Sequence, residues 1–131
     1  MSENNRDFRS ALSRVRGLGS AKSGTGHWWS TRLSSLALIP LGVWFVVSLL
    51  GLIGAPHATV VLWMSSPFVA VMLILLIVAT FHHAALGMQT VYEDYIHDHT
   101  LRLMADLGTK GLLAVFAVAT IIAVIRTGLG G

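Results

Sequence analysis

Three stretches of this chain are each long enough and apolar enough to cross a lipid bilayer, which restricts the fold more than any other feature. They lie at about residues 33–53, 67–90 and 107–126. A hydrocarbon core about 30 Å thick requires about 20 apolar residues in a helix, and inside it the backbone must be hydrogen-bonded internally. The chain is 11% charged, whereas soluble domains are about 25% charged. We therefore predict an all-α membrane protein with three transmembrane helices.

The segments between these stretches contain signals for turns and helix ends. Residues 54–57 form a predicted turn, and residues 58–64 are apolar but short, which favours a position along the outer membrane interface. Ser66 and Pro67 are typical of a helix start, because serine caps a helix and proline fits its first turn. Residues 100–107 form a predicted amphipathic lead-in to the third stretch.

The positive charges are concentrated before the first apolar stretch, and this determines the predicted orientation. Of the 9 Lys and Arg residues, six lie within residues 1–32 and none lies in the first loop. Because cytoplasmic segments carry an excess of Lys and Arg, we place the N-terminus in the cytoplasm. We expect residues 1–26 to form a polar, basic cytoplasmic arm that either contacts a partner or only sets the topology. Residues 27–131 then form a three-helix transmembrane domain.

Composition excludes several classes of function. A sequence pI of about 10.0 and a net charge of +3 would suit a nucleic-acid-binding protein. The basic residues lie where topology signals lie, however, so we expect no nucleic-acid partner. The chain has no cysteine, which excludes disulfides, cysteine-ligated iron–sulfur clusters and cysteine-attached haem within it.

The second apolar stretch contains two adjacent histidines, His82 and His83. Histidines within a membrane segment are rare and costly, so they indicate a functional site. On a helix, Thr80 and Gly87 lie on the same face as His83, and small side chains there leave room for a flat macrocycle. We therefore predict that His83 is a haem ligand. Two alternatives remain open: a hydrogen bond to a neighbouring helix, and a metal or proton path through both histidines.

Polar residues follow at the predicted cytoplasmic end of the same helix. Asp94 lies eleven residues after His83, and eleven steps of about 100° return to nearly the same face, about 16 Å along the axis. The Tyr95 hydroxyl can donate a hydrogen bond to a quinone carbonyl, while Asp94 can orient that hydroxyl or relay a proton. The alternative is an ordinary helix end at the interface. His97 and His99 would supply either protons or a metal site.

Another group of residues marks the start of the first stretch. Trp28 and Trp29 are typical of a membrane interface, and His27 precedes them. Arg32 follows at the boundary, where its guanidinium either extends to lipid headgroups or points inward at an anion such as a haem propionate. The spacing alone leaves both interpretations open.

At these residues the chain becomes similar to a known family. The pattern is a histidine, a glycine four residues later, and an Asp-Tyr pair eleven and twelve residues after the histidine, here His83, Gly87, Asp94 and Tyr95. Together with the Leu-Arg-Leu-Met run that begins at Leu101, it resembles the small hydrophobic membrane-anchor subunit of succinate dehydrogenase, the second cytochrome b anchor of respiratory complex II. The resemblance covers roughly residues 24–126.

The resemblance implies specific roles for these residues. It implies that His83, with Gly87 beside it, is one axial ligand of a b-type haem, and that a companion anchor subunit provides the other ligand. It implies that Tyr95 hydrogen-bonds ubiquinone and that Asp94 lines the quinone site. Arg32 is the best match for an arginine that approaches a haem propionate or the quinone site.

The resemblance also implies an assembly. Three helices would form a bundle that a second anchor subunit of similar size completes, in a bacterial inner membrane. The pair would dock an iron–sulfur subunit and a flavoprotein subunit on the cytoplasmic face, so that electrons from succinate reach ubiquinone near Tyr95. The chain would not be catalytic alone. The alternatives are a haemless structural membrane anchor and a small proton or metal transporter subunit.

Overall fold

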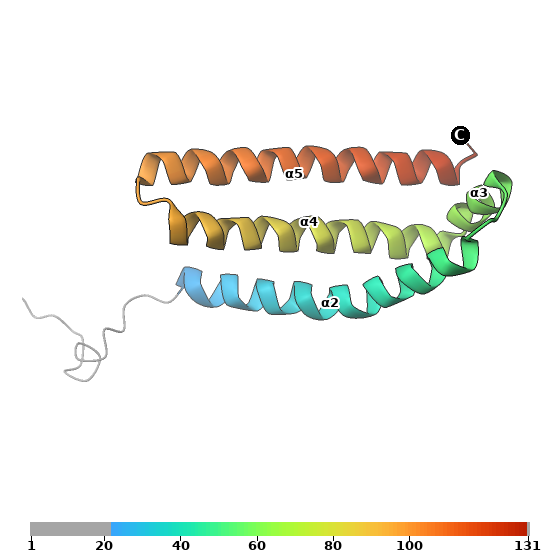
Figure 1. Cartoon of the computed structure of the whole chain (residues 1–131), viewed down its shortest axis with the longest axis horizontal. Helices are drawn as coiled ribbons and strands as arrows, with labels where there is room; N and C mark the ends of the chain where they lie inside the picture. The colour runs from blue at the N-terminus through green and yellow to red at the C-terminus, as the bar shows by residue number, and fades with distance from the viewer. Residues whose placement is uncertain (1–21, 131) are drawn as a thin grey trace, which may run out of the picture.

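The computed structural model describes residues 22–130 of the chain, and the regular elements within this range are all helices. Helix α2 comprises Lys22–Leu52, α3 comprises His57–Ser65, α4 comprises Pro67–Tyr95 and α5 comprises His99–Gly128 (Figure 1). Helices α2, α4 and α5 are each long and apolar enough to cross a membrane. The prediction of an all-α protein with three membrane-spanning helices is therefore confirmed.

The helices extend further than the apolar stretches that predict them. Helix α2 begins at Lys22 rather than near residue 33, α4 ends at Tyr95 rather than near residue 90, and α5 begins at His99 rather than near residue 107. Hydropathy marks where the bilayer core begins, whereas helical hydrogen bonding continues through the polar interface. Residues 100–107 are consequently the first turns of α5 itself.

The glycines at the end of the predicted N-terminal arm do not interrupt the first helix. Gly24 and Gly26 both lie within α2, so residues 22–26 are helical. A glycine in a helix costs about 1 kcal/mol relative to alanine, but extending an existing helix requires no new nucleation step. The rest of the predicted arm, residues 1–21, lies outside the described residues.

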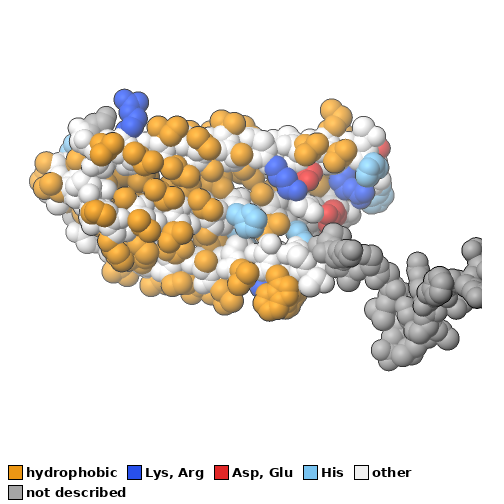
Figure 2. All heavy atoms as spheres, turned by 180° about the vertical axis from the view of Figure 1, so that it is seen from behind, with side chains coloured by type: hydrophobic (Ala, Val, Ile, Leu, Met, Phe, Trp, Pro, Cys, Tyr) orange, Lys and Arg blue, Asp and Glu red, His pale blue; other side chains and the backbone are white. Residues whose placement is uncertain are grey.

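The three long helices form a flat layer with α4 in the middle. Helix α4 contacts α2 on one side and α5 on the other, and α3 packs against α4 and α5 (Figure 1). Such a layer has little interior, and its buried side chains among the described residues are Ser34, Leu41, Val69, Leu73 and Val124. Figure 2 shows hydrophobic side chains over most of one face, with charged side chains gathered toward the end where α2 begins. In a membrane, lipid tails or the helices of another chain cover such a surface.

The tightest packing lies at the end of the layer that contains α3. The side chains of Trp44 and Trp63 stack with ring centroids 5.9 Å apart and border the cluster of Val69, Leu73 and Val124. At the end of α5, a Cβ added to Gly128 would lie 2.9 Å from the carbonyl oxygen of Met64. A side chain does not fit there without a backbone shift, so this glycine lets α5 approach α3 closely.

Candidate functional site

His83 lies on the side of α4 that packs against α2. Its Nδ1 is 2.9 Å from the Oγ of Ser34, a residue of α2 that is only 7% exposed. The Ser34 hydroxyl also donates a hydrogen bond to the carbonyl oxygen of Thr31, at 3.0 Å. The imidazole is thus hydrogen-bonded to a neighbouring helix through Nδ1, while its Nε2 has no hydrogen-bond partner among the described residues. The two sequence interpretations of His83 are therefore compatible, because each uses a different ring nitrogen.

The surface of α4 beside His83 is open. Gly87 is exposed one turn along the helix, and a Cβ added there would meet no atom within 4 Å. Thr80 on the same face is also exposed. A histidine nitrogen without a hydrogen-bond partner among the described residues, next to an unfilled surface of small residues, fits the requirements of a haem ligand.

His82 faces a different environment from that of its neighbour. Its side chain is exposed and borders two grooves, one between α2 and α4 and the other between α4 and α5. The first groove is lined mainly by apolar side chains such as Leu41 and Leu75. The two histidines are about 100° apart around the helix, and no hydrogen bond links them within residues 22–130. The structure therefore offers no single site that uses both.

Asp94 and Tyr95 lie on the same unbroken helix as His83, because α4 continues to Tyr95. Asp94 therefore shares the helix face of His83, about 16 Å along the axis. Both residues are exposed, and the Tyr95 side chain reaches 80% exposure. Neither side chain forms a hydrogen bond with another described residue. Their polar groups are accordingly free to contact a ligand or another chain.

Arg32 is not brought to His83. Its guanidinium carbon lies 5.1 Å from the centroid of the Trp28 ring, and the residue is exposed. Arg32 is two positions before Ser34, which places it about 200° away around α2. The charge therefore lies on a different side of α2 from the contact with His83. A cation over an aromatic face is a favourable, solvent-accessible arrangement.

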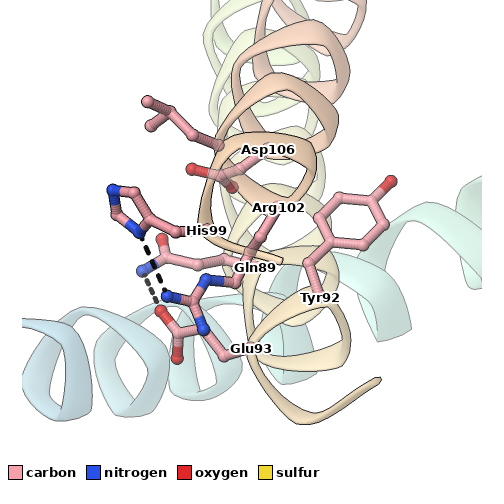
Figure 3. Close-up of a pocket in the computed structure, with 7 residues that line it drawn as sticks. Gln89, Tyr92, Glu93, His99, Arg102 and Asp106 are labelled. Carbon is pink, nitrogen blue, oxygen red and sulfur yellow. Dashed lines mark hydrogen bonds between the residues drawn. The ribbon is translucent and has the colours of Figure 1, made fainter. Parts of the chain in front are cut away.

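A polar cavity of about 150 Å³ lies between α4 and α5, near the loop that joins them (Figure 3). Its lining residues are Gln89, Tyr92, Glu93, His99, Arg102, Leu103 and Asp106. Beside it, Lys110 Nζ donates hydrogen bonds to Asp106 Oδ2 at 2.8 Å and to Gln89 Oε1 at 2.9 Å. Gln89 Nε2 in turn donates to Glu93 Oε1 at 2.9 Å. This network joins the two helices and pairs opposite charges.

A second polar contact joins the same two helices. The Tyr92 hydroxyl lies 2.6 Å from Thr109 Oγ1, and in Figure 3 the Tyr92 ring points away from His99 and Glu93. The residues of this contact and of the cavity network form no motif that the sequence alone singles out. The available signal was a polar stripe on each helix, at residues 89, 92 and 93 and at residues 102, 106, 109 and 110.

The alternative metal site at His97 and His99 gains no support from the arrangement of side chains. Within residues 22–130, no group of three or more His, Asp and Glu residues is placed to hold a metal ion. His99 instead lies within hydrogen-bonding distance of Arg102, with its Nδ1 3.4 Å from the guanidinium. Asp98 caps α5 by accepting a hydrogen bond from the backbone N–H of Thr100.

Comparisons with known proteins complete this description. The family model described as succinate dehydrogenase/fumarate reductase transmembrane subunit matches residues 6–125. The chain is 33% identical over 118 residues to the succinate dehydrogenase hydrophobic membrane anchor subunit of Rickettsia conorii, covering 89% of this chain and 90% of the relative. The subunit of the same name from Paracoccus denitrificans is 30% identical over 116 residues, covering 88% and 89%. No solved structure gives a significant match.

Proposed function

The chain belongs to the succinate dehydrogenase/fumarate reductase transmembrane subunit family, and from this premise we propose that it is the hydrophobic membrane anchor of a succinate:ubiquinone oxidoreductase. It spans the membrane three times with its N-terminus in the cytoplasm, because most Lys and Arg residues precede the first span. It pairs with a second anchor subunit and docks the iron–sulfur and flavoprotein subunits on the cytoplasmic face of a bacterial inner membrane. Succinate itself is oxidised by those partner subunits.

The imidazole of His83 would hold a haem b that is shared with the companion anchor. The observation that carries this proposal is that Nδ1 of the imidazole is bonded to Ser34, while Nε2 has no hydrogen-bond partner among residues 22–130 and the same helix is open one turn away at Gly87. When bound, the haem supplies reversible one-electron transfer. Arg32 is proposed as a contact of a haem propionate on the resemblance alone, because its guanidinium lies over Trp28, on a different side of α2 from the His83 contact.

Tyr95 and Asp94 form this chain's part of the ubiquinone site. The Tyr95 hydroxyl donates a hydrogen bond to a quinone carbonyl, and Asp94 orients that hydroxyl or relays a proton from the cytoplasm. Support comes from their position at the end of α4 and from their high exposure. Groups with no hydrogen-bond partner among residues 22–130 are suited to a site that other subunits complete.

The test of the haem assignment is a reduced-minus-oxidised absorption spectrum of the purified complex, comparing the wild type with His83→Ala. We expect the b-type band to disappear in His83→Ala. His82→Ala is the matched control, since it removes an exposed imidazole from another side of α4, and we expect it to keep the band. Succinate–quinone reductase activity of the same samples then shows whether haem contributes to turnover.

Each other outcome contradicts a defined part of the proposal. If the b-type band is unchanged in His83→Ala and lost in His82→Ala, the haem ligand is His82. Absence of the band from the wild-type complex identifies a haemless structural anchor. Ion transport by the isolated chain in vesicles would instead favour a small transporter subunit.

A further inference from the structure

The contact between Ser34 and His83 joins two transmembrane helices at a part-buried point. Ser34 is the buried polar residue of the described chain, with 7% exposure, and its Oγ lies 2.9 Å from His83 Nδ1. The two residues are far apart in sequence, so the contact depends on how α2 packs against α4. The hydrogen bond is part-buried, with the Ser34 side covered by the packed helices, and a polar contact shielded in part from water is electrostatically stronger than one in bulk water.

The hydrogens of this pair can be assigned by counting donors and acceptors. A serine hydroxyl has one hydrogen and two acceptor lone pairs, and a neutral imidazole has one N–H. The Ser34 hydroxyl donates to the carbonyl oxygen of Thr31 at 3.0 Å, so its oxygen accepts from His83 Nδ1–H. In the reverse arrangement, Nε2 would carry the ring hydrogen without an acceptor among the described residues, which is costly in an apolar environment.

This assignment fixes the chemistry of the other ring nitrogen. With the hydrogen on Nδ1, the Nε2 of His83 carries a lone pair, which is the form that binds a metal. Histidine ligands generally donate their second N–H to an acceptor, which fixes the ring orientation and raises the basicity of the ligating nitrogen. Here the acceptor is an uncharged hydroxyl that is itself held by the α2 backbone.

We infer that Ser34 is a positioning residue for the haem ligand: it holds His83 as the Nδ1–H tautomer and aims Nε2 at the haem iron. The inference rests on the proposed haem function and deepens it. It also gives α2 a role in the site, because the packing of α2 on α4 then determines the orientation of the ligand. The Thr31–Ser34–His83 relay links the backbone of one helix to the imidazole of the other.

The neighbouring serine provides a matched control. Ser35 Oγ donates to the same Thr31 carbonyl oxygen at 2.8 Å, but it forms no hydrogen bond with His83. Ser34→Ala and Ser35→Ala therefore remove the same group from adjacent positions, and only the first breaks the contact with the imidazole. Ser34→Thr keeps the hydroxyl, while Ser34→Val has the shape of threonine without a hydroxyl, and this pair separates chemistry from packing.

The experiment measures haem retention and haem midpoint potential in the purified complex of each variant. In metal sites, loss of such an outer partner typically weakens affinity about 10- to 100-fold, and we expect Ser34→Ala to retain haem about tenfold more weakly. We expect its potential to rise, because a less basic imidazole stabilises ferric iron less than before. A tenfold larger loss of affinity in the ferric form than in the ferrous form corresponds to about 59 mV.

The outcomes distinguish this inference from the haem proposal itself. Ser35→Ala and Ser34→Thr are expected to match the wild type, and Ser34→Val to match Ser34→Ala. If haem is present in the wild type and lost in His83→Ala, yet Ser34→Ala and Ser34→Val keep the wild-type potential and retention, the Ser34 inference is overturned while the ligand stands. If Ser34→Ala does not assemble, the comparison of Ser34→Thr with Ser34→Val decides the question. If the wild type contains no haem, both proposals fail.

Discussion

Replacement of Tyr95 by phenylalanine tests the proposed quinone site with little disturbance of the chain. The Tyr95 side chain is 80% exposed, and its hydroxyl has no hydrogen-bond partner among residues 22–130. Tyr95→Phe therefore breaks no contact within the described chain, and its whole effect on turnover should come from the lost bond to quinone. The folded anchor and its assembly into the complex should be unchanged.

The expected magnitude follows from the strength of a single hydrogen bond. A bond to a neutral quinone carbonyl contributes about 0.5–1.5 kcal/mol, which lowers kcat/KM about 2- to 13-fold at 1.36 kcal/mol per tenfold change. A bond that strengthens as negative charge develops on the quinone oxygen contributes about 1.5–3 kcal/mol. The loss in kcat/KM then becomes about 13- to 160-fold.

The chain contains a matched control, since its 2 tyrosines both lie on α4 and differ in their contacts. The Tyr92 hydroxyl is already paired with Thr109 at 2.6 Å and lies about 60° away around the helix. Succinate–quinone reductase activity should fall in Tyr95→Phe and stay near the wild type in Tyr92→Phe. Succinate oxidation with a soluble artificial acceptor should be unchanged in both. Equal quinone reduction by Tyr95→Phe and the wild type would refute the assignment.

Two further predictions concern glycines of the membrane helices. Gly87→Leu should leave the chain folded, because nothing lies within 4 Å of the added Cβ. The leucine should lower the haem content per complex, because it fills the surface beside His83. An unchanged haem content would contradict the proposed position of the macrocycle. Gly128→Ala should destabilise the anchor by about 1–3 kcal/mol through its overlap with Met64, measured by unfolding in detergent. Gly111→Ala should not destabilise it, because the added Cβ meets no atom. Equal stability of the two variants would show that α3 shifts to accommodate the methyl group without loss of stability.

The number and order of the membrane helices were predictable from sequence because they depend on local hydropathy. The ends were not, because hydropathy reports on the bilayer while helix ends depend on caps such as Asp98, whose carboxylate accepts from Thr100 N–H. The position of His83 and Asp94 on one helix face was predictable from their spacing, provided that the helix continues unbroken between them, as α4 does. Local periodicity therefore predicts which residues share one helix face.

The contacts between helices could not be predicted from the spacing of residues in the sequence. Ser34 is a small polar residue of a membrane span, which by itself names no partner, and its pairing with His83 depends on the register of α2 against α4. The same holds for Lys110, whose donation to Gln89 links α5 to α4. Register is set by packing along the whole helix pair, including the edge-to-face contact of Trp44 on α2 with Phe68 on α4, which no short motif encodes.

The flat arrangement of the helices explains how one central helix can serve several purposes. Because α4 lies between α2 and α5, two of its sides are used to build the layer and two remain exposed. His83 lies where the α2 side meets an exposed side, so Nδ1 is held by Ser34 while Nε2 remains free. A closed three-helix bundle would enclose the imidazole fully and leave no edge for a shared cofactor. An open layer leaves that edge accessible to the proposed companion anchor, as the proposed ligand site divided between two subunits would require.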